Sequence, residues 1–381
     1  MNISLKRTEE QVELVKAMAS KNREVSYEAQ AALAEFIGPV LDEVVQQAPV
    51  VSNLFTSFEF NADDNPSIPL DLYYDITDED YIQVYSTSIA GGMPTSTVAP
   101  THSELKFTTY TLDSAVEFLK KYAAKSRLDV VSKTFTRVAQ EILLKQQRTS
   151  ANILLGTLKD AVTTTYSGSS LRHVVDAGTA GTVKLDDFNK LLTRAKRINT
   201  SWAGGTGEGS GRGITDLMVS PEVVQNLREM AYNPINTRDL SGAEGASASA
   251  DGGVIAGTEN MRNAVYNNAG LPEFYGISIM EINELGVGQK FNDIYLALGG
   301  VDESGNPAAA TDEIAIGLDR SRESLLRAVA LDSDTGSQFT LLPDDQYSVR
   351  QQKIGFYGSM EEGRMILDNR AVFGLLVDRD V

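Results

Sequence analysis

Apolar residues recur at helical spacing in two stretches of the first fifty residues. Thr8 can cap the first stretch and Ser26 the second, because a hydroxyl group accepts a hydrogen bond from the first turn of a helix. The apolar positions are Val12, Val15, Met18, Leu33, Ile37, Leu41 and Val44. Gly38-Pro39 should break the second helix, since proline has no amide N–H. Short helices are marginal alone, so this arm, residues 1–52, needs a surface: the body of this chain or a neighbouring copy.

Residues 53–105 alternate aromatic side chains with turn-forming ones. The large apolar positions are Phe55, Phe58, Phe60, Leu70, Leu72, Tyr73, Tyr74, Tyr81 and Tyr85. Turn sequences stand at 63–66 (DDNP) and 91–94 (GGMP). The pattern predicts a long two-stranded hairpin with an acidic tip. A lone hairpin is not stable in water, so we expect it to pack on another part of the assembly, such as a neighbouring copy.

The longest helical pattern covers residues 129–155, with Asp129 as the expected N-cap and Gly156 as the expected stop. Its apolar face is formed by Val131, Phe135, Val138, Ile142, Ala151, Leu154 and Leu155. Such a helix is about 40 Å long, which is typical of a structural spine. The segment before it fits a strand, but Ser114 and Glu117 also fit a helical capping box, so both alternatives stay open.

The second half of the chain predicts alternating short elements and loops. Helices are expected at 185–198 and at 221–231, where Ser220 and Pro221 form a helix start. Gly-rich segments at 202–213 and 241–258 predict flexible loops. Strands are expected around 214–219, 277–282, 294–298, 314–318, 347–356 and 371–377.

Composition narrows the class of protein. The 381 residues are 42% hydrophobic, which is enough for two or more cores, and no apolar run is long enough for a membrane span. There is no cysteine and there are only two histidines, so thiolate chemistry and most zinc sites are excluded. The net charge of −18 opposes binding to a phosphate backbone. We expect a soluble protein, or one suited to contain nucleic acid without adhering to it.

Candidate chemical motifs are each incomplete. The Gly-rich segment 204–213 lacks the Lys-Ser/Thr ending of a phosphate-binding loop, and the acidic run 75–80 lacks the glycine and glutamate of a calcium loop. Ser210 has no partner base in sequence, and His102 and His173 are expected as packing or surface residues. We therefore expect no enzyme activity, no cofactor and no metal.

The order of elements resembles the major capsid proteins of tailed bacteriophages (Caudoviricetes) with the Hong Kong 97-type fold. Local strings are also similar to that family: TDLMVSPE at 215–222, LPEFYGI at 271–277, KIGF at 353–356 and LDNRAV at 367–372. The resemblance covers nearly the whole chain and rests on order and spacing more than on any one motif.

The resemblance implies an α+β Hong Kong 97-like capsid fold. Its parts would be the N-terminal helical arm 1–52, the E-loop hairpin 53–105, a P-domain 106–199 with the spine helix 129–155, an A-domain 200–340, and C-terminal strands 341–381 returning to these domains. Contacts between subunits are expected at Phe58, Phe60, Leu72, Tyr73, Tyr74, Tyr81, Tyr85, Leu33, Ile37 and Leu41.

The implied function is that of a structural protein of the virion, assembled in the host cytoplasm. Hexamers and pentamers would form an icosahedral shell around double-stranded DNA, with cement or decoration, scaffolding and portal proteins as partners and no membrane. The family's founding member cross-links its shell from an E-loop lysine, but residues 53–105 contain no lysine, so we expect no covalent cross-link. A chain that begins at Met1 is expected to need a separate scaffolding protein.

Three alternatives remain at this stage. The first is an encapsulin-like compartment shell with the same fold, which cargo enzyme instead of DNA would indicate. The second is another multimeric phage protein, such as a tail or vertex component. The third is a carboxylate-dependent hydrolase, which a pocket with two facing carboxylates of perturbed pKa would favour.

Overall fold

The computed structural model describes residues 8–46, 51–61, 65–69, 104–125, 127–164, 168–198, 213–232, 273–274, 276–332, 336–344 and 352–380. It combines helices with mixed sheets, which confirms the α+β class. Contacts divide the described residues into two compact units. Unit 1 takes the described residues within 8–69, 104–151 and 325–365, and unit 2 takes those within 152–324 and 366–380.

Unit 1 packs helices against a five-stranded sheet. Its helices are α1 (Glu9–Met18), α2 (Arg23–Gln46), α3 (Lys120–Ala124) and most of α4 (Leu128–Asp160), with a 3-10 turn η1 at Ser52–Leu54. Its strands are β1 (Thr56–Asn61), β2 (Ser67–Pro69), β3 (Glu104–Lys106), β4 (Thr109–Leu119), β12 (Leu325–Leu331), β13 (Thr340–Asp344) and β14 (Lys353–Ile366). The sheet order is β1-β12-β14-β13, and β4 also pairs with β14, while β2 and β3 form a separate antiparallel pair.

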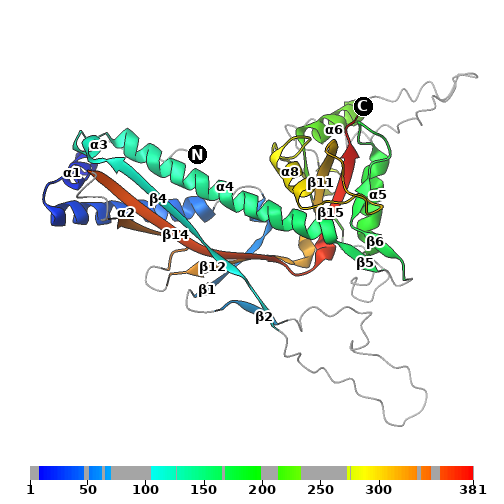
Figure 1. Ribbon diagram of the computed structural model, residues 1–381, viewed down its shortest axis with the longest axis horizontal. Helices are drawn as coiled ribbons and strands as arrows, with labels where there is room; N and C mark the ends of the chain where they lie inside the picture. The colour runs from blue at the N-terminus through cyan, green and yellow to red at the C-terminus, as the bar shows by residue number, and fades with distance from the viewer. Residues whose placement is uncertain are drawn as a thin grey trace, which may run out of the picture. The chain divides into compact units, whose positions relative to one another are not determined.

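The core of unit 1 lies between the helices and one face of the sheet. Helix α4 runs alongside the long strands β4 and β14 (Figure 1). The apolar stripe of α4 meets alternate residues of β14, so that Phe135 contacts the ring of Phe356 edge-on at 5.2 Å. Leu33, Ile37 and Leu41 of α2 close the same core. Burying these faces on one another is what makes the helices stable, since propensity alone does not.

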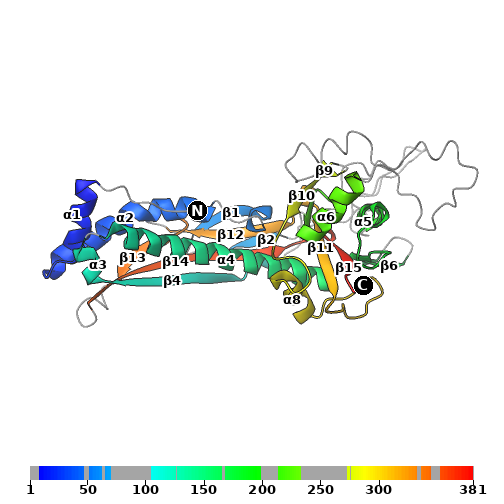
Figure 2. The ribbon, with the colours of Figure 1, turned by 90° about the horizontal axis from the view of Figure 1, so that it is seen from above.

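Unit 2 is built on a six-stranded sheet in the order β7-β15-β11-β8-β10-β9. These strands are β7 (Val174–Asp176), β8 (Asp216–Val219), β9 (Glu273–Phe274), β10 (Ile277–Glu281), β11 (Asp312–Leu318) and β15 (Val372–Asp378). A small hairpin of β5 (Val162–Thr164) and β6 (Ser170–Arg172) lies outside it. Helices α5 (Leu185–Ile198) and α6 (Pro221–Tyr232) lie on one side of the sheet and α8 (Lys290–Ala297) on the other (Figure 2).

The sheet of unit 2 is covered on both faces, which explains its strand composition. Strand β8 is buried at every position and β15 at six of its seven. Phe373 and Leu375 face α5 and α6, while Gly374 faces Leu158 so closely that a Cβ atom would meet its methyl group at 2.9 Å. Strands buried on both faces read as continuous apolar runs.

Several predicted helix boundaries are confirmed. Thr8 caps α1 by accepting from the backbone N–H of Gln11. Helix α5 has the predicted bounds, and the carboxylate of Asp187 accepts the backbone N–H of Lys184 at its start. Ser220 caps α6 by accepting from Val223 N at 3.1 Å.

The predicted ends of the long helices are wrong. Helix α2 continues through Pro39 to Gln46, because Leu41 and Val44, which follow the proline, are buried in the core of unit 1. Ser26 is not a cap but lies inside α2, where its hydroxyl donates to the carbonyl oxygen of Met18 at 2.7 Å. Helix α4 extends past Gly156 to Asp160, because Leu158 is buried there.

Two predicted strands also need correction. Residues 294–298 fall in α8 and just after it, since Phe291 and Tyr295 are buried one helical turn apart. Strand β1 does not return along a hairpin but pairs in parallel with β12, Phe58 opposite Ala328. The open choice before α4 is settled in favour of a strand, β4.

The five-part division expected from the resemblance stays a prediction. Within the described residues, β7 and α5 pack in unit 2, because β7 pairs with β15. The predicted hairpin is described only at its base, where β2 and β3 pair. The predicted loops 202–213 and 241–258, apart from Gly213, and most of the hairpin lie outside the described residues, as do His102, Ser210 and the acidic run 75–80.

Candidate assembly site

Three of the predicted contact residues lie on the arm, and the structure buries all three. Leu33, Ile37 and Leu41 belong to the core of unit 1 and have almost no exposed surface. The surface on which the arm lies is therefore the body of this chain. Within this chain the three side chains are core residues, and their contact with a neighbouring copy stays a prediction.

Two further predicted residues lie on strand β1, the last strand of its sheet among the described residues. Phe58 and Phe60 are both half-buried. Phe58 packs edge-on against Phe107 with ring centroids 5.0 Å apart. An edge strand offers unpaired N–H and C=O groups to another chain, so a contact at β1 stays a prediction. The remaining predicted residues, Leu72, Tyr73, Tyr74, Tyr81 and Tyr85, lie outside the described residues.

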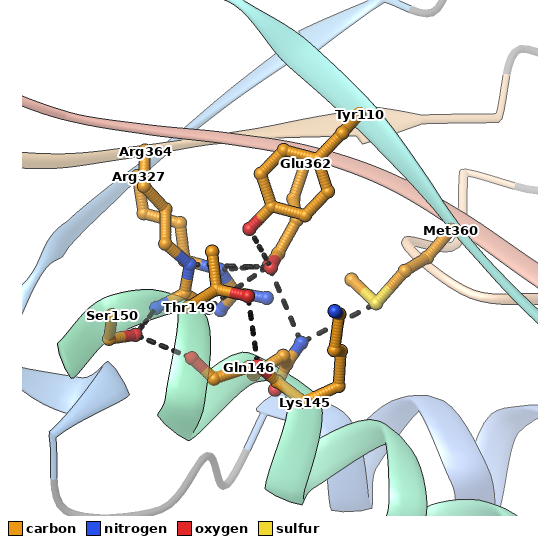
Figure 3. A network of polar contacts seen from close by, with 9 residues as sticks. All are labelled: Tyr110, Lys145, Gln146, Thr149, Ser150, Arg327, Met360, Glu362 and Arg364. Carbon is orange, nitrogen blue, oxygen red and sulfur yellow. Dashed lines mark hydrogen bonds and ion pairs between the residues drawn. The ribbon is translucent and has the colours of Figure 1, made fainter. Parts of the chain in front are cut away.

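A buried polar network holds this framework together (Figure 3). The residues of β14 that face the core alternate, and they change from apolar at Ile354, Phe356 and Met360 to charged at Glu362 and Arg364. The core-facing positions of α4 change in the same region, to Gln146 and Ser150. One layer of the helix–sheet interface is thus polar.

Glu362 is the centre of the network. Its Oε2 accepts from Arg327 Nε at 3.0 Å and from Arg364 Nη2 at 3.1 Å, and its Oε1 accepts from the hydroxyl of Tyr110 at 2.7 Å. Arg364 also donates to the hydroxyl of Ser150, and its guanidinium lies 5.6 Å from the ring centroid of Phe55. Strands β4, β12 and β14 and helix α4 therefore all contribute to one cluster.

The electrostatics of the cluster favour a charged Glu362. Burial raises the pKa of its carboxyl, but Arg364 and Arg327 lower it further, so the pKa lies below the ordinary value. Burial raises the pKa of the Tyr110 hydroxyl, and the negative charge of Glu362 adds to this. Burial also lowers the pKa of Arg327, but an arginine side chain stays protonated in proteins.

The cluster is not balanced in charge. Two guanidinium groups face one carboxylate, and all three side chains have at most 6% of their surface exposed. Among the described residues, Arg327 Nη2 and Gln146 Oε1 have no hydrogen-bond partner. Breaking a buried pair leaves an uncompensated charge, so each charged side chain of the cluster depends on the others, and none of the three is exposed to solvent.

His173 is a packing residue, as the sequence predicted. It is fully buried, and its ring stacks on Phe373 at 5.5 Å. Its Nδ1 lies 3.0 Å from the carbonyl oxygens of Asn369 and Val372, so this nitrogen carries the proton. Its Nε2 is then free to accept from the hydroxyl of Thr163 at 2.7 Å.

Unit 2 has a groove along α5, but its charges are already paired. It is lined by Leu171, Val175, Asp186, Asn189, Lys190, Thr193, Arg194, Arg197 and Glu303. Arg194 forms an ion pair with Glu303, and Lys190 lies 3.3 Å from Asp186. The groove therefore presents no concentrated charge of either sign.

Two carboxylates of unit 2 have a raised pKa, and besides burial the charge of Asp312 contributes to the raised pKa of Asp176. Burial raises the pKa of Asp176 and of Asp312, and neither residue lines the α5 groove. The two carboxylates accept backbone N–H groups, of Glu303 at 3.1 Å and of Ala309 at 2.6 Å. Within the described part of the chain, no group of three or more acidic or histidine side chains is placed to hold a metal ion, and no helix is long and apolar enough to cross a membrane.

No family model matches the chain, and no curated protein matches its sequence. Solved structures do match in fold. One is from Microbacterium phage Oxtober96, with 13% identity over 87% of this chain and 91% of that chain at a TM-score of 0.47. Another is the capsid of a native GTA particle, with 13% identity over 86% and 91% at a TM-score of 0.45. A third is an encapsulin complex from Synechococcus elongatus, with 12% identity over 73% and 77% at a TM-score of 0.40. These values describe a partial likeness in fold and say nothing of function.

Proposed function

We propose that this chain is the major capsid protein of a tailed bacteriophage and that it acts by assembling with copies of itself. Copies of the chain form hexamers and pentamers of an icosahedral shell that encloses double-stranded DNA. The chain has a structural role in the virion and catalyses no reaction.

One observation carries this proposal: a 33-residue helix, α4, follows a segment that is predicted to be a hairpin and whose described base is the short pair β2 and β3. The described core of unit 1 includes residues of α2, α4 and β14. A long insertion that is rich in aromatic and acidic side chains is suited to contact a neighbouring copy. The edge strand β1 next to it adds unpaired backbone groups.

The shell is held by noncovalent contacts. Residues 53–105 contain no lysine, so the hairpin cannot supply an amine for an isopeptide bond. Cement, scaffolding and portal proteins complete the assembly. The net charge of −18 suits a container for DNA, because phosphate groups are repelled from an acidic wall.

The contents of purified particles test the proposal against its nearest alternative. The full chain is produced in a bacterial host together with the other head proteins of its source, and fast-sedimenting particles are treated with nuclease. We expect DNA that resists the nuclease. Particles that contain a cargo enzyme and no DNA would favour an encapsulin-like compartment and overturn the phage assignment.

A deletion tests the role assigned to the hairpin. Residues 71–102 are replaced by a short Gly-Ser linker, which leaves the pair β2 and β3 in place. We expect a folded chain, with an unchanged helix content by circular dichroism, that no longer forms particles. A chain that unfolds would place the hairpin in an internal core, and a chain that still assembles would remove the hairpin from the contacts.

A further inference from the structure

Helix α2 has an exposed apolar stripe that borders its buried face. Val25, Phe36 and Val40 are 41%, 55% and 40% exposed. Phe36 lies 11 residues after Val25, and Val40 lies 4 residues after Phe36. Ala32, between Val25 and Phe36, is also exposed, so the four residues lie along one side of the helix. Scattered exposed apolar residues need no explanation, but an aligned stripe with a phenylalanine at its centre indicates a contact.

Acidic side chains flank this stripe. Glu28, Glu35 and Glu43 are exposed and occur at the same helical spacing. Their charge disfavours a symmetric contact between two α2 helices, because glutamates of one copy would lie near those of the other, and opposed like charges cost several kcal/mol. The partner surface must therefore combine apolar side chains with positive charge.

Such a surface exists on the same chain, around α3. Leu119 and Tyr122 are 43% and 39% exposed. Residues 118–128 contain Lys120, Lys121, Lys125 and Arg127 and no acidic residue, in a chain whose net charge is −18. The basic end of α5 is a poorer candidate, because Arg194 is paired with Glu303 and no large apolar side chain of α5 is among the exposed ones.

We propose that the acidic apolar stripe of α2 on one copy binds the basic apolar patch around α3 on a second copy. Phe36 and Val40 pack on Tyr122 and Leu119, and Glu35 and Glu43 face Lys121 and Lys125. The contact is heterologous, so repeating it closes a ring or extends an array. The inference deepens the proposed function and rests on it, since it names one of the contacts by which copies associate.

Charge reversal tests the contact. One variant carries Lys121→Glu and Lys125→Glu, and the other carries Glu35→Lys and Glu43→Lys. We expect each alone to reduce the assembled fraction by about tenfold or more in sedimentation, since opposed like charges weaken association by at least that factor. Combining all four substitutions in one chain restores the attraction and should recover assembly.

Lys290→Glu, at an exposed position of unit 2, is the matched control and should leave assembly unchanged. Folding of each variant is checked by circular dichroism.

A disulfide test separates this contact from the shell itself. The chain has no cysteine, so Val40→Cys and Tyr122→Cys can be introduced in two separate chains that are then mixed under mild oxidation. We expect a cross-linked heterodimer on a non-reducing gel, and a control mixture of Val40→Cys with Lys290→Cys should give none above background.

The outcomes are distinct. Cross-linking without particles supports the contact and contradicts the proposed shell. Particles that form without cross-linking, and that tolerate both charge reversals, support the shell and overturn the contact. Absence of both overturns both.

Discussion

Units 1 and 2 each bury a glutamate against arginine, but in different surroundings. In unit 1, Glu362 is enclosed with Arg327 and Arg364, and no charge of the three reaches solvent freely. In unit 2, Glu313 accepts from Arg379 Nε at 2.6 Å and from the hydroxyl of Ser220, and Arg379 keeps 15% of its side chain exposed. Arg379 also donates to Gly181 O and Asn226 Oδ1.

The difference shows where each unit depends on charge. Removal of Glu362 leaves two guanidinium groups without a counter-ion, whereas removal of Glu313 leaves one arginine with other acceptors and some access to water. Unit 2 instead relies on apolar strands buried on both faces. We therefore expect unit 1, which carries the arm and the hairpin base, to be the unit that electrostatic changes destabilise.

The largest effect should follow Glu362→Ala. We expect a loss of about 3–5 kcal/mol in the free energy of unfolding, because a buried pair is broken and its cations remain. Glu313→Ala is the matched change in unit 2 and should cost clearly less. Glu361→Ala, at the neighbouring position of the same strand, should cost under about 0.5 kcal/mol. Thermal and urea unfolding of the three variants measure this, and equal losses for Glu362→Ala and Glu313→Ala would contradict the comparison.

A smaller effect is expected from two glycines that each touch an aromatic ring. A Cβ atom at Gly358 in unit 1 would overlap the ring of Phe339, and one at Gly300 in unit 2 would overlap the ring of Tyr295. Each change to alanine should cost about 1–3 kcal/mol by overpacking. Gly300→Ala should cost more, because the hydroxyl of Tyr295 is fixed by both backbone groups of Val301. Gly156→Ala in α4, where the space is open, should stabilise by about 0.5–1 kcal/mol. The order of the three melting temperatures tests this ranking.

The smallest difference should appear in the response to acid. The pKa of Glu362 is below its ordinary value of 4.5, so its contribution is present above pH 4.5 and is lost as the pH falls through the lower folded value. The pKa values of Asp176 and Asp312 are above 3.8, so their charged forms destabilise unit 2, and this penalty is relieved as the pH falls through the raised values. Hydrogen exchange below pH 4.5 should therefore increase in unit 1 before unit 2. The opposite order would contradict these assignments.

Local signals predicted the elements whose determinants lie within a few residues. Ser220 caps α6 from the residue before it, and Asp187 lies in the first turn of α5, so the starts of both helices were predictable. The predicted helix ends at Pro39 and Gly156 were wrong, because burial of Leu41 and Leu158 outweighs the local preference for ending the helix. The pairing of β1 with β12 joins residues that are far apart in sequence, and no local pattern indicates such a partner.

The candidate site was predictable to a lesser degree. Helical spacing correctly identified Leu33, Ile37 and Leu41 as an apolar face, but not whether their own chain covers them. The exposed Phe36 and Val40 were missed, although a phenylalanine off the main stripe is a readable signal. The network around Glu362 also had a signal, since Gln146 and Ser150 interrupt the apolar face of α4. Its arginine partners could be identified only from the fold.

Electron microscopy of the purified full-length chain tests the central claim, that this protein is a self-assembling shell subunit, most directly. Across a series of salt and protein concentrations, we predict closed particles, or free hexamers and pentamers that convert into them. A chain that remains a uniform monomer under every condition, with and without its head-assembly partners, would contradict the account.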